Sequence, residues 1–118
     1  MLFIAEGKRK KIILRKVRHA ISFAEQAKGL MFERKRNFDY GLVFHLPFET
    51  RAGASVHMLF VFFPIDIVYL DAQKRITEIA RLNPWQLNFT PRKAAKWFIE
   101  LPAGKAKGLK AGEKVEWD

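Results

Sequence analysis

The sequence predicts a mainly β protein, an antiparallel β-sandwich or barrel with one or two short helices, and three observations support this prediction. Short apolar runs recur along the chain and turn residues separate them. No internal repeat, low-complexity segment or linker interrupts the pattern. The 118 residues fit a single domain over residues 1–118, and 49% hydrophobic residues with 11 Phe supply enough apolar surface for a core.

Eight strands are expected. The most apolar stretch reads as two consecutive buried strands, Ser55–Phe63 and Ile65–Leu70, with Pro64 as a kink between them because proline cannot donate to a sheet ladder. The remaining expected strands are Leu2–Ala5, Ile12–Val17, Gly41–Leu46, Arg75–Leu82, Trp97–Leu101 and Lys114–Trp117. Asp71 can bond its own downstream backbone, so residues 70–75 predict a hairpin turn between antiparallel strands.

Two short helices are indicated by their starting residues. Ser22 followed by Glu25 fits a capping box, and Gly29 stands where such a helix ends, so a helix is expected over about residues 22–28. Thr90 before Pro91 is typical of a helix start, which predicts a second helix of one to two turns ending near residue 96.

The composition excludes some chemistry. The chain has no Cys, which rules out disulfides, thiolate metal ligands and a cysteine nucleophile. The longest uncharged run, Ala52–Ile65, has 14 residues and falls short of the roughly 18 to 20 that span a bilayer. The apolar start of the chain precedes its basic residues, which is the wrong order for a secretory signal. We therefore expect a cytoplasmic protein without a membrane span.

The charge is strongly basic and uneven. The formal net charge is +10, and residues 1–36 hold 11 Lys and Arg against 3 Glu. Such a field attracts polyanions, so nonspecific nucleic-acid binding through the basic N-terminal third is one alternative function. The other interpretation is that these charges cover the solvent-exposed faces of strands.

The sequence lacks motifs that are typical of enzymes, cofactor sites or metal sites. It contains no GxSxG, P-loop, GxGxxG or HExxH pattern. The three histidines, His19, His45 and His57, show no paired spacing of the kind zinc sites use. No cofactor and no metal site are expected.

His57 and Asp66 interrupt the apolar central stretch with groups that can titrate. If the two expected strands lay side by side, the imidazole and the carboxylate could meet and form a general base, which defines a small enzyme as an alternative function. The competing interpretation is structural: Asp66 bonds turn amides or an arginine, and His57 packs on an apolar face.

Trp85 lies in a loop framed by Pro84 and Pro91, beside amide side chains and Phe89. Exposed aromatic rings next to amides suit a sugar or peptide ligand. The alternative is that Trp85 plugs one end of the sandwich.

Arg34 follows the first expected helix. It could hold a carboxylate or phosphate ligand, or it could pair with Asp66 or Asp71 and tie the helix to the sheet.

Several motifs in fixed order resemble the domain-of-unknown-function family 192 (DUF192), in its archaeal form. They are Ala24–Met31 with Arg34, Gly41–Phe44, His57-Met58, Phe63–Asp71, Pro84-Trp85, Glu100–Gly104 and Lys110–Val115. The resemblance implies a β-rich, sandwich-type fold with jelly-roll character and no established activity. Many bacterial members carry polar Met-Lys-Asn-Thr before the proline; Met58–Val61 is apolar here, which favours a buried structural strand.

These observations together favour a binding or interaction module for an unidentified small molecule or protein. The candidate binding residues, expected near one another at the loop end, are Arg34, His57, Asp66 and Trp85. The residues leave open whether the protein is an enzyme.

Overall fold

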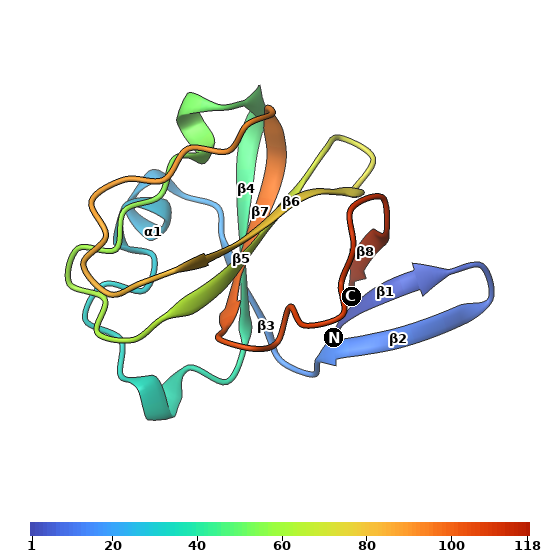
Figure 1. The fold of residues 1–118 in the computed structure, drawn as a ribbon, viewed down its shortest axis with the longest axis horizontal. Helices are drawn as coiled ribbons and strands as arrows, with labels where there is room; N and C mark the ends of the chain where they lie inside the picture. The colour runs from blue at the N-terminus through green and yellow to red at the C-terminus, as the bar shows by residue number, and fades with distance from the viewer.

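The computed structural model describes residues 1–118 as two β-sheets, one α-helix and two short 3₁₀ turns (Figure 1). The strands are β1 (Leu2–Glu6), β2 (Arg9–Leu14), β3 (Val17–Ala20), β4 (Gly41–Thr50), β5 (Ile65–Leu70), β6 (Ile76–Leu82), β7 (Ala95–Pro102) and β8 (Lys114–Trp117). The helical elements are α1 (Phe23–Lys28), η1 (Lys35–Asn37) and η2 (Ala52–Ala54). None of the helices has the length and apolar character needed to cross a bilayer.

The larger sheet has five strands in the order β3-β4-β7-β5-β6, and the smaller has three in the order β2-β1-β8. Strand β3 runs parallel to β4, while the other pairs are antiparallel. The mainly β fold is therefore confirmed, with one parallel pair added. The expected strand Ile12–Val17 is divided, because β2 ends at Leu14 and β3 begins only at Val17 in the other sheet.

Strand β5 is buried along its whole length, which agrees with its continuous apolar sequence. Alternate side chains point to opposite faces of the large sheet. Ile67 and Tyr69 join one apolar core, under α1 and the loops, and Val68 and Leu70 join a second core against the small sheet. The hairpin to β6 is confirmed, and the Asp71 carboxylate accepts hydrogen bonds from two turn amides at 2.9 and 3.0 Å.

The expected strand Ser55–Phe63 is wrong, since this segment is an irregular loop after η2. Phe60 has a φ of +60°, which an extended strand does not permit. The loop pairs instead with the loop after β6: Val56 and Phe89 exchange two hydrogen bonds of 2.8 Å, and the Met58 amide donates to the Gln86 carbonyl. Its apolar character reflects alternate residues buried in the first core, with phenylalanines left exposed between them.

The first expected helix is confirmed, including its capping box. The Glu25 amide donates to Ser22 Oγ at 3.1 Å, and Glu25 Oε1 accepts from the Ser22 amide at 2.9 Å. The second expected helix is wrong: residues 91–94 are a bend, and β7 begins at Ala95. Ala95 is fully buried and pairs with Thr50 of β4, and the Arg92 amide donates to a Glu78 oxygen, so sheet pairing overrides the local helix signal.

Candidate functional site

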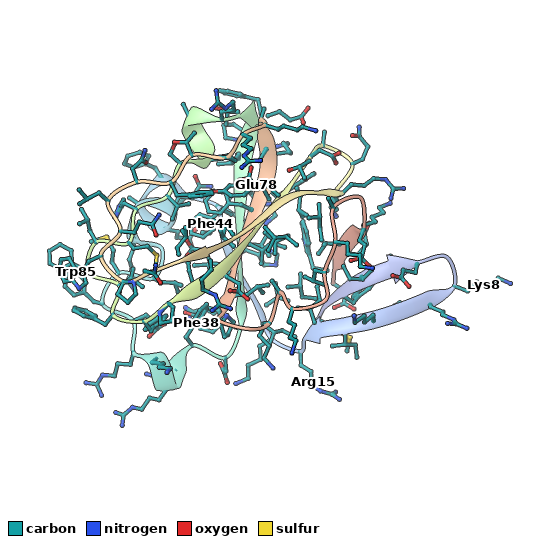
Figure 2. The ribbon with its side chains drawn as sticks, viewed as in Figure 1. Lys8, Arg15, Phe38, Phe44, Glu78 and Trp85 are labelled. Carbon is teal, nitrogen blue, oxygen red and sulfur yellow. The ribbon has the colours of Figure 1, made fainter.

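A partly enclosed pocket lies between α1 and the loop of residues 55–61, above the large sheet. Its volume is about 60 Å³. Strand β7 contributes Phe98 and Glu100 to the pocket, and β4 contributes Phe44, whose side chain lies in the interior of the molecule in Figure 2. The rings of Phe44 and Phe98 stack with centroids 4.2 Å apart. The sheet therefore presents an aromatic surface with one carboxyl group to the pocket.

Glu100 is the feature that distinguishes this pocket. Its side chain is 4% exposed, and its Oε1 atom has no hydrogen-bond partner in the protein. Leu42 and Ile67 face it directly across the neighbouring strands, and neither offers a donor. Burial raises the pKa of the Glu100 carboxyl from 4.5 to about 8. An unpaired buried polar group costs about 1–3 kcal/mol, so this residue lowers the stability of the fold.

Gly29 lines the pocket close to Glu100. It ends α1 with a φ of +48°, a left-handed conformation that favours glycine. A Cβ atom at this position would lie 3.5 Å from Phe44 Cζ and 3.8 Å from Glu100 Oε1. The helix end therefore brings bare backbone close to the buried carboxyl group.

His57 is exposed and lines the same pocket from the loop side. Its Nδ1 accepts a hydrogen bond from the Leu59 amide at 3.2 Å. In the neutral ring the proton is then assigned to Nε2, which makes no hydrogen bond within the protein. His57 can thus present a donor at the pocket, although its sequence neighbours are apolar.

A group of four exposed aromatic residues, called here the aromatic cluster, flanks the pocket. It consists of Phe32, Phe60, Phe62 and Trp85. Phe32 stacks on Phe60 with centroids 4.8 Å apart, and Trp85 lies 5.0 Å from Phe60 and 5.7 Å from Phe62. The cluster and the pocket share two segments, because Met31 and Met58 line the pocket beside these residues.

Three members of the aromatic cluster have a positive φ: +63° at Phe32, +60° at Phe60 and +64° at Trp85. This conformation is uncommon for large side chains and carries a strain of order 1–3 kcal/mol. Two backbone bonds hold it, from the Phe32 amide to the Phe60 carbonyl at 2.9 Å and from the Trp85 amide to the Met58 carbonyl at 3.0 Å. Backbone strain concentrated on exposed rings favours a functional surface over a simple packing role.

The four residues predicted as a binding site do not gather in one place. His57 lines the pocket, and Trp85 belongs to the adjacent aromatic cluster. Trp85 is 46% exposed and lies at the outer edge of the molecule in Figure 2, so it does not plug the sandwich. Arg34 is exposed at the start of η1, and its side chain makes no ion pair.

Asp66 lies apart from His57, on the opposite face of the large sheet. Its carboxylate pairs with Arg81 and accepts hydrogen bonds from the amides of Gly104 at 2.8 Å and Ala106 at 3.1 Å. Every one of its bonds is thus directed to an arginine or to the turn after β7, which is the structural interpretation raised from the sequence. The expected ties from Arg34 to Asp66 or Asp71 are not formed.

Sequence reasoning missed Glu100 as a site residue. One signal was present: Glu100 is the only charged residue in the segment Trp97–Leu101, and period-two alternation places it on the same face as Phe98. What the sequence did not indicate is that no basic side chain would approach it.

A broader hollow of about 540 Å³ lies beside β3 and the chain termini. Four of its charged groups already have partners: Lys16 pairs with Asp39 at 2.7 Å, and the terminal amine pairs with Asp118 at 2.8 Å. Arg18 lies over the Tyr40 ring, 4.8 Å from its centroid. With both of its carboxylates paired within the protein, this hollow is a weaker candidate than the pocket at Glu100.

The basic residues of the first third occupy separate parts of the molecule. Residues 8–11 lie at the end of the β1–β2 hairpin, which projects from the body, and residues 34–36 lie around η1 at another corner (Figures 1 and 2). No group of three or more His, Asp or Glu side chains is positioned to hold a metal ion.

The fold and the pocket define a small β-sandwich protein with a buried, unpartnered carboxyl group beside the aromatic cluster. The chain belongs to the DUF192 family, "Uncharacterized ACR, COG1430", whose pattern matches residues 2–117. It is 43% identical over 104 residues to a UPF0127 protein of Pyrococcus abyssi, covering 86% of each chain. This confirms the resemblance to archaeal members.

Two solved bacterial structures share the fold. A protein of unknown function from Novosphingobium aromaticivorans matches with a TM-score of 0.83 at 27% identity, over 98% of this chain and 83% of that chain. A putative transcription regulator from Sinorhizobium meliloti matches with a TM-score of 0.80 at 21% identity, over 98% and 90%. The second likeness concerns the fold alone.

Proposed function

We propose that this protein is a binding module for a small molecule, with its binding site in the pocket between α1 and residues 55–61. The observation that carries the proposal is Glu100, a fully buried carboxyl group whose Oε1 atom points to no partner in the protein. Buried polar groups in folded proteins almost always find a hydrogen bond. A ligand that supplies this bond would offset the destabilisation that Glu100 imposes on the empty pocket.

The surroundings of Glu100 support a ligand with an apolar body and a polar head. Phe44, Phe98 and Met58 provide apolar contacts within the pocket, and His57 offers a ring nitrogen on the loop side. Mostly apolar walls with a few fixed polar groups are the usual composition of small-molecule sites. The aromatic cluster beside the pocket extends the apolar surface that a larger ligand would contact.

The test is a binding screen on the wild-type protein and on Glu100→Gln, which keeps the shape of the side chain. Glu49→Gln is the matched control, because Glu49 is exposed on β4. We expect a ligand to shift the amide resonances of Gly29 and His57 and to raise the melting temperature by mass action. Both effects should weaken in Glu100→Gln and persist in Glu49→Gln. Ligands that shift only distant residues would contradict the proposal.

Acid–base catalysis is a second candidate function, because the pKa of Glu100 near 8 lets this carboxyl exchange protons around neutral pH. The sequence suggested a small enzyme that uses His57 with Asp66; Glu100, at the same pocket as His57, replaces Asp66 as the carboxyl group of that pair. The two candidate functions can be distinguished by following a ligand of the pocket by NMR for several hours in the presence of the protein. A binding module leaves the ligand chemically unchanged, whereas an enzyme converts it in a Glu100-dependent way.

Nucleic-acid binding through the basic N-terminal third and a cytoplasmic location stay predictions. Oligonucleotide binding that fades with added salt would reflect charge alone.

A further inference from the structure

The chemistry of the missing partner follows from the polar groups around Glu100. Two other polar side chains of the pocket are already engaged: Gln26 Nε2 donates to the His45 carbonyl at 2.6 Å, and Ser55 Oγ pairs with Thr90 Oγ1 at 2.9 Å. The protonated carboxyl has an accepting carbonyl oxygen and the ionised form has two accepting oxygens, so a donor on the ligand can pair with Glu100 in either state. His57 and Lys28 line the same pocket, but neither bonds Glu100 Oε1, so a donor on a ligand can take that place.

The residues that line the pocket favour a charged donor over a neutral one. The stacked rings of Phe44 and Phe98 line the pocket together with Glu100, and both Phe44 Cζ and Glu100 Oε1 lie within 4 Å of the Cβ position of Gly29. An ionised carboxylate set among aromatic walls attracts a cation through charge-assisted hydrogen bonds. A neutral hydroxyl or amide would satisfy the hydrogen bond and leave Glu100 protonated, whereas a cation lets the carboxyl ionise and form the stronger charge-assisted bonds.

The volume and the charge of the pocket restrict the size and the charge of the ligand. The volume of about 60 Å³ has room for a head group of only a few heavy atoms. Lys28 lines the pocket as well, and it lies near Glu33, whose pKa is lowered mainly by the hydrogen bond from Tyr40 and less by the Lys28 charge. A second positive charge on the ligand would meet Lys28, so a monoamine with a neutral or anionic body fits better than a polyamine.

We propose that the pocket binds the primary ammonium group of a small monoamine, with the Glu100 carboxylate as its counter-ion. This inference rests on the proposed function and names the ligand class of the same site. In the protein without ligand, the Glu100 carboxyl is protonated at neutral pH, because its pKa is about 8. Binding of an ammonium ion therefore releases the carboxyl proton to solvent, while the amine keeps its own.

The experiment compares n-propylammonium with propionamide, propionate and propan-1-ol, each up to about 0.1 M at constant ionic strength. Binding is read from the amide resonances of Gly29 and His57, and proton release from calorimetry in buffers of different ionisation enthalpy. We expect only n-propylammonium to bind, with release of about one proton and about a tenfold gain in affinity from pH 6 to pH 7. In Glu100→Gln the affinity should fall at least about tenfold, and in Glu49→Gln it should not change.

The outcomes separate this inference from the proposed function. If propionamide or propionate binds at these resonances and n-propylammonium does not, the ammonium inference is overturned and the binding module stands. Binding of n-propylammonium without proton release also overturns it, because Glu100 is then not the counter-ion. If no probe binds and the wider screen finds no ligand, both proposals fall. The proton release is measured on the wild-type protein, so the test does not depend on the folding of a variant.

Discussion

Glu100 Oε1 and Gly29 face each other so closely that a Cβ atom on Gly29 would lie 3.8 Å from the carboxyl oxygen. The left-handed turn that ends α1 thus brings backbone, not a side chain, against a buried group without a partner. This relationship joins the two parts of the proposed site, since the helix end and the sheet would hold the ligand together. The unpartnered carboxyl also lowers the free energy of unfolding of the protein without ligand, and this effect can be measured.

The buried Glu100 carboxyl predicts an unusual dependence of stability on pH. The pKa of Glu100 is about 8 in the folded protein and near 4.5 when the carboxyl is free, so the folded state binds the extra proton between these values. The free energy of unfolding should therefore fall as pH rises from about 4.5 to about 8. Chemical denaturation should show Glu100→Gln more stable than wild type at pH 9, by an amount on the order of 2–4 kcal/mol, and similar at pH 5. A constant difference between the two proteins would contradict this.

The histidine pair on the other face of the sheet predicts a contribution of opposite sign. His19 Nδ1 and His45 Nε2 share a hydrogen bond of 2.8 Å, and burial lowers the pKa of His45, with the charges of His19, Lys96 and Lys74 adding to the effect. The unfolded state then binds more protons below about pH 6.5, so this pair loses stability as pH falls. Urea denaturation of wild type and His45→Gln should show a smaller loss between pH 7 and pH 5 in the variant. An equal loss in both would refute the assignment.

Asp66 is predicted to stabilise the fold and not to act in the pocket. Asp66→Asn removes the charge that pairs with Arg81 while keeping a side chain of the same shape. Because the carboxylate is buried and also accepts two turn amides, we expect a loss of about 2–3 kcal/mol in thermal or chemical denaturation. Asp39→Asn, which breaks only an exposed pair with Lys16, should cost below about 1 kcal/mol. Ligand binding at Glu100 should survive both substitutions.

The capping box of α1 is predicted to support the pocket. Ser22→Ala removes the side-chain oxygen that receives the Glu25 amide and should cost about 1 kcal/mol of stability. Because Gly29 ends the same short helix, fraying should also weaken binding in the pocket. Ser22→Asp keeps an acceptor at the cap and is the matched control. Hydrogen exchange of α1 amides would be faster in Ser22→Ala only.

The elements that local patterns define were predicted well from the sequence. The capping box, the Asp71 turn and the strands Ile65–Leu70 and Lys114–Trp117 were confirmed at their expected bounds, because their signals lie within a few residues. Segments whose state depends on partners far along the chain were predicted wrongly. Residues 55–63 are apolar enough for a strand, yet they lie beside another loop and Phe60 turns left-handed.

The candidate site was only half predictable for the same reason. Trp85 and His57 stood out by residue type, and both lie at or beside the pocket. Glu100 carries no motif, and what makes it exceptional is that Leu42 and Ile67 face it from neighbouring strands. Strand order decides those neighbours, and the order β4-β7-β5 cannot be read from a single sequence.

The most direct test of the account is a titration of the Glu100 side-chain carboxyl by ¹³C NMR, without and with n-propylammonium. The account predicts a pKa near 8 in the free protein and a marked fall when the ammonium ion binds. A titration near the ordinary value of 4.5 that does not respond to n-propylammonium would contradict it, because Glu100 would then already have the partner that we assign to the ligand.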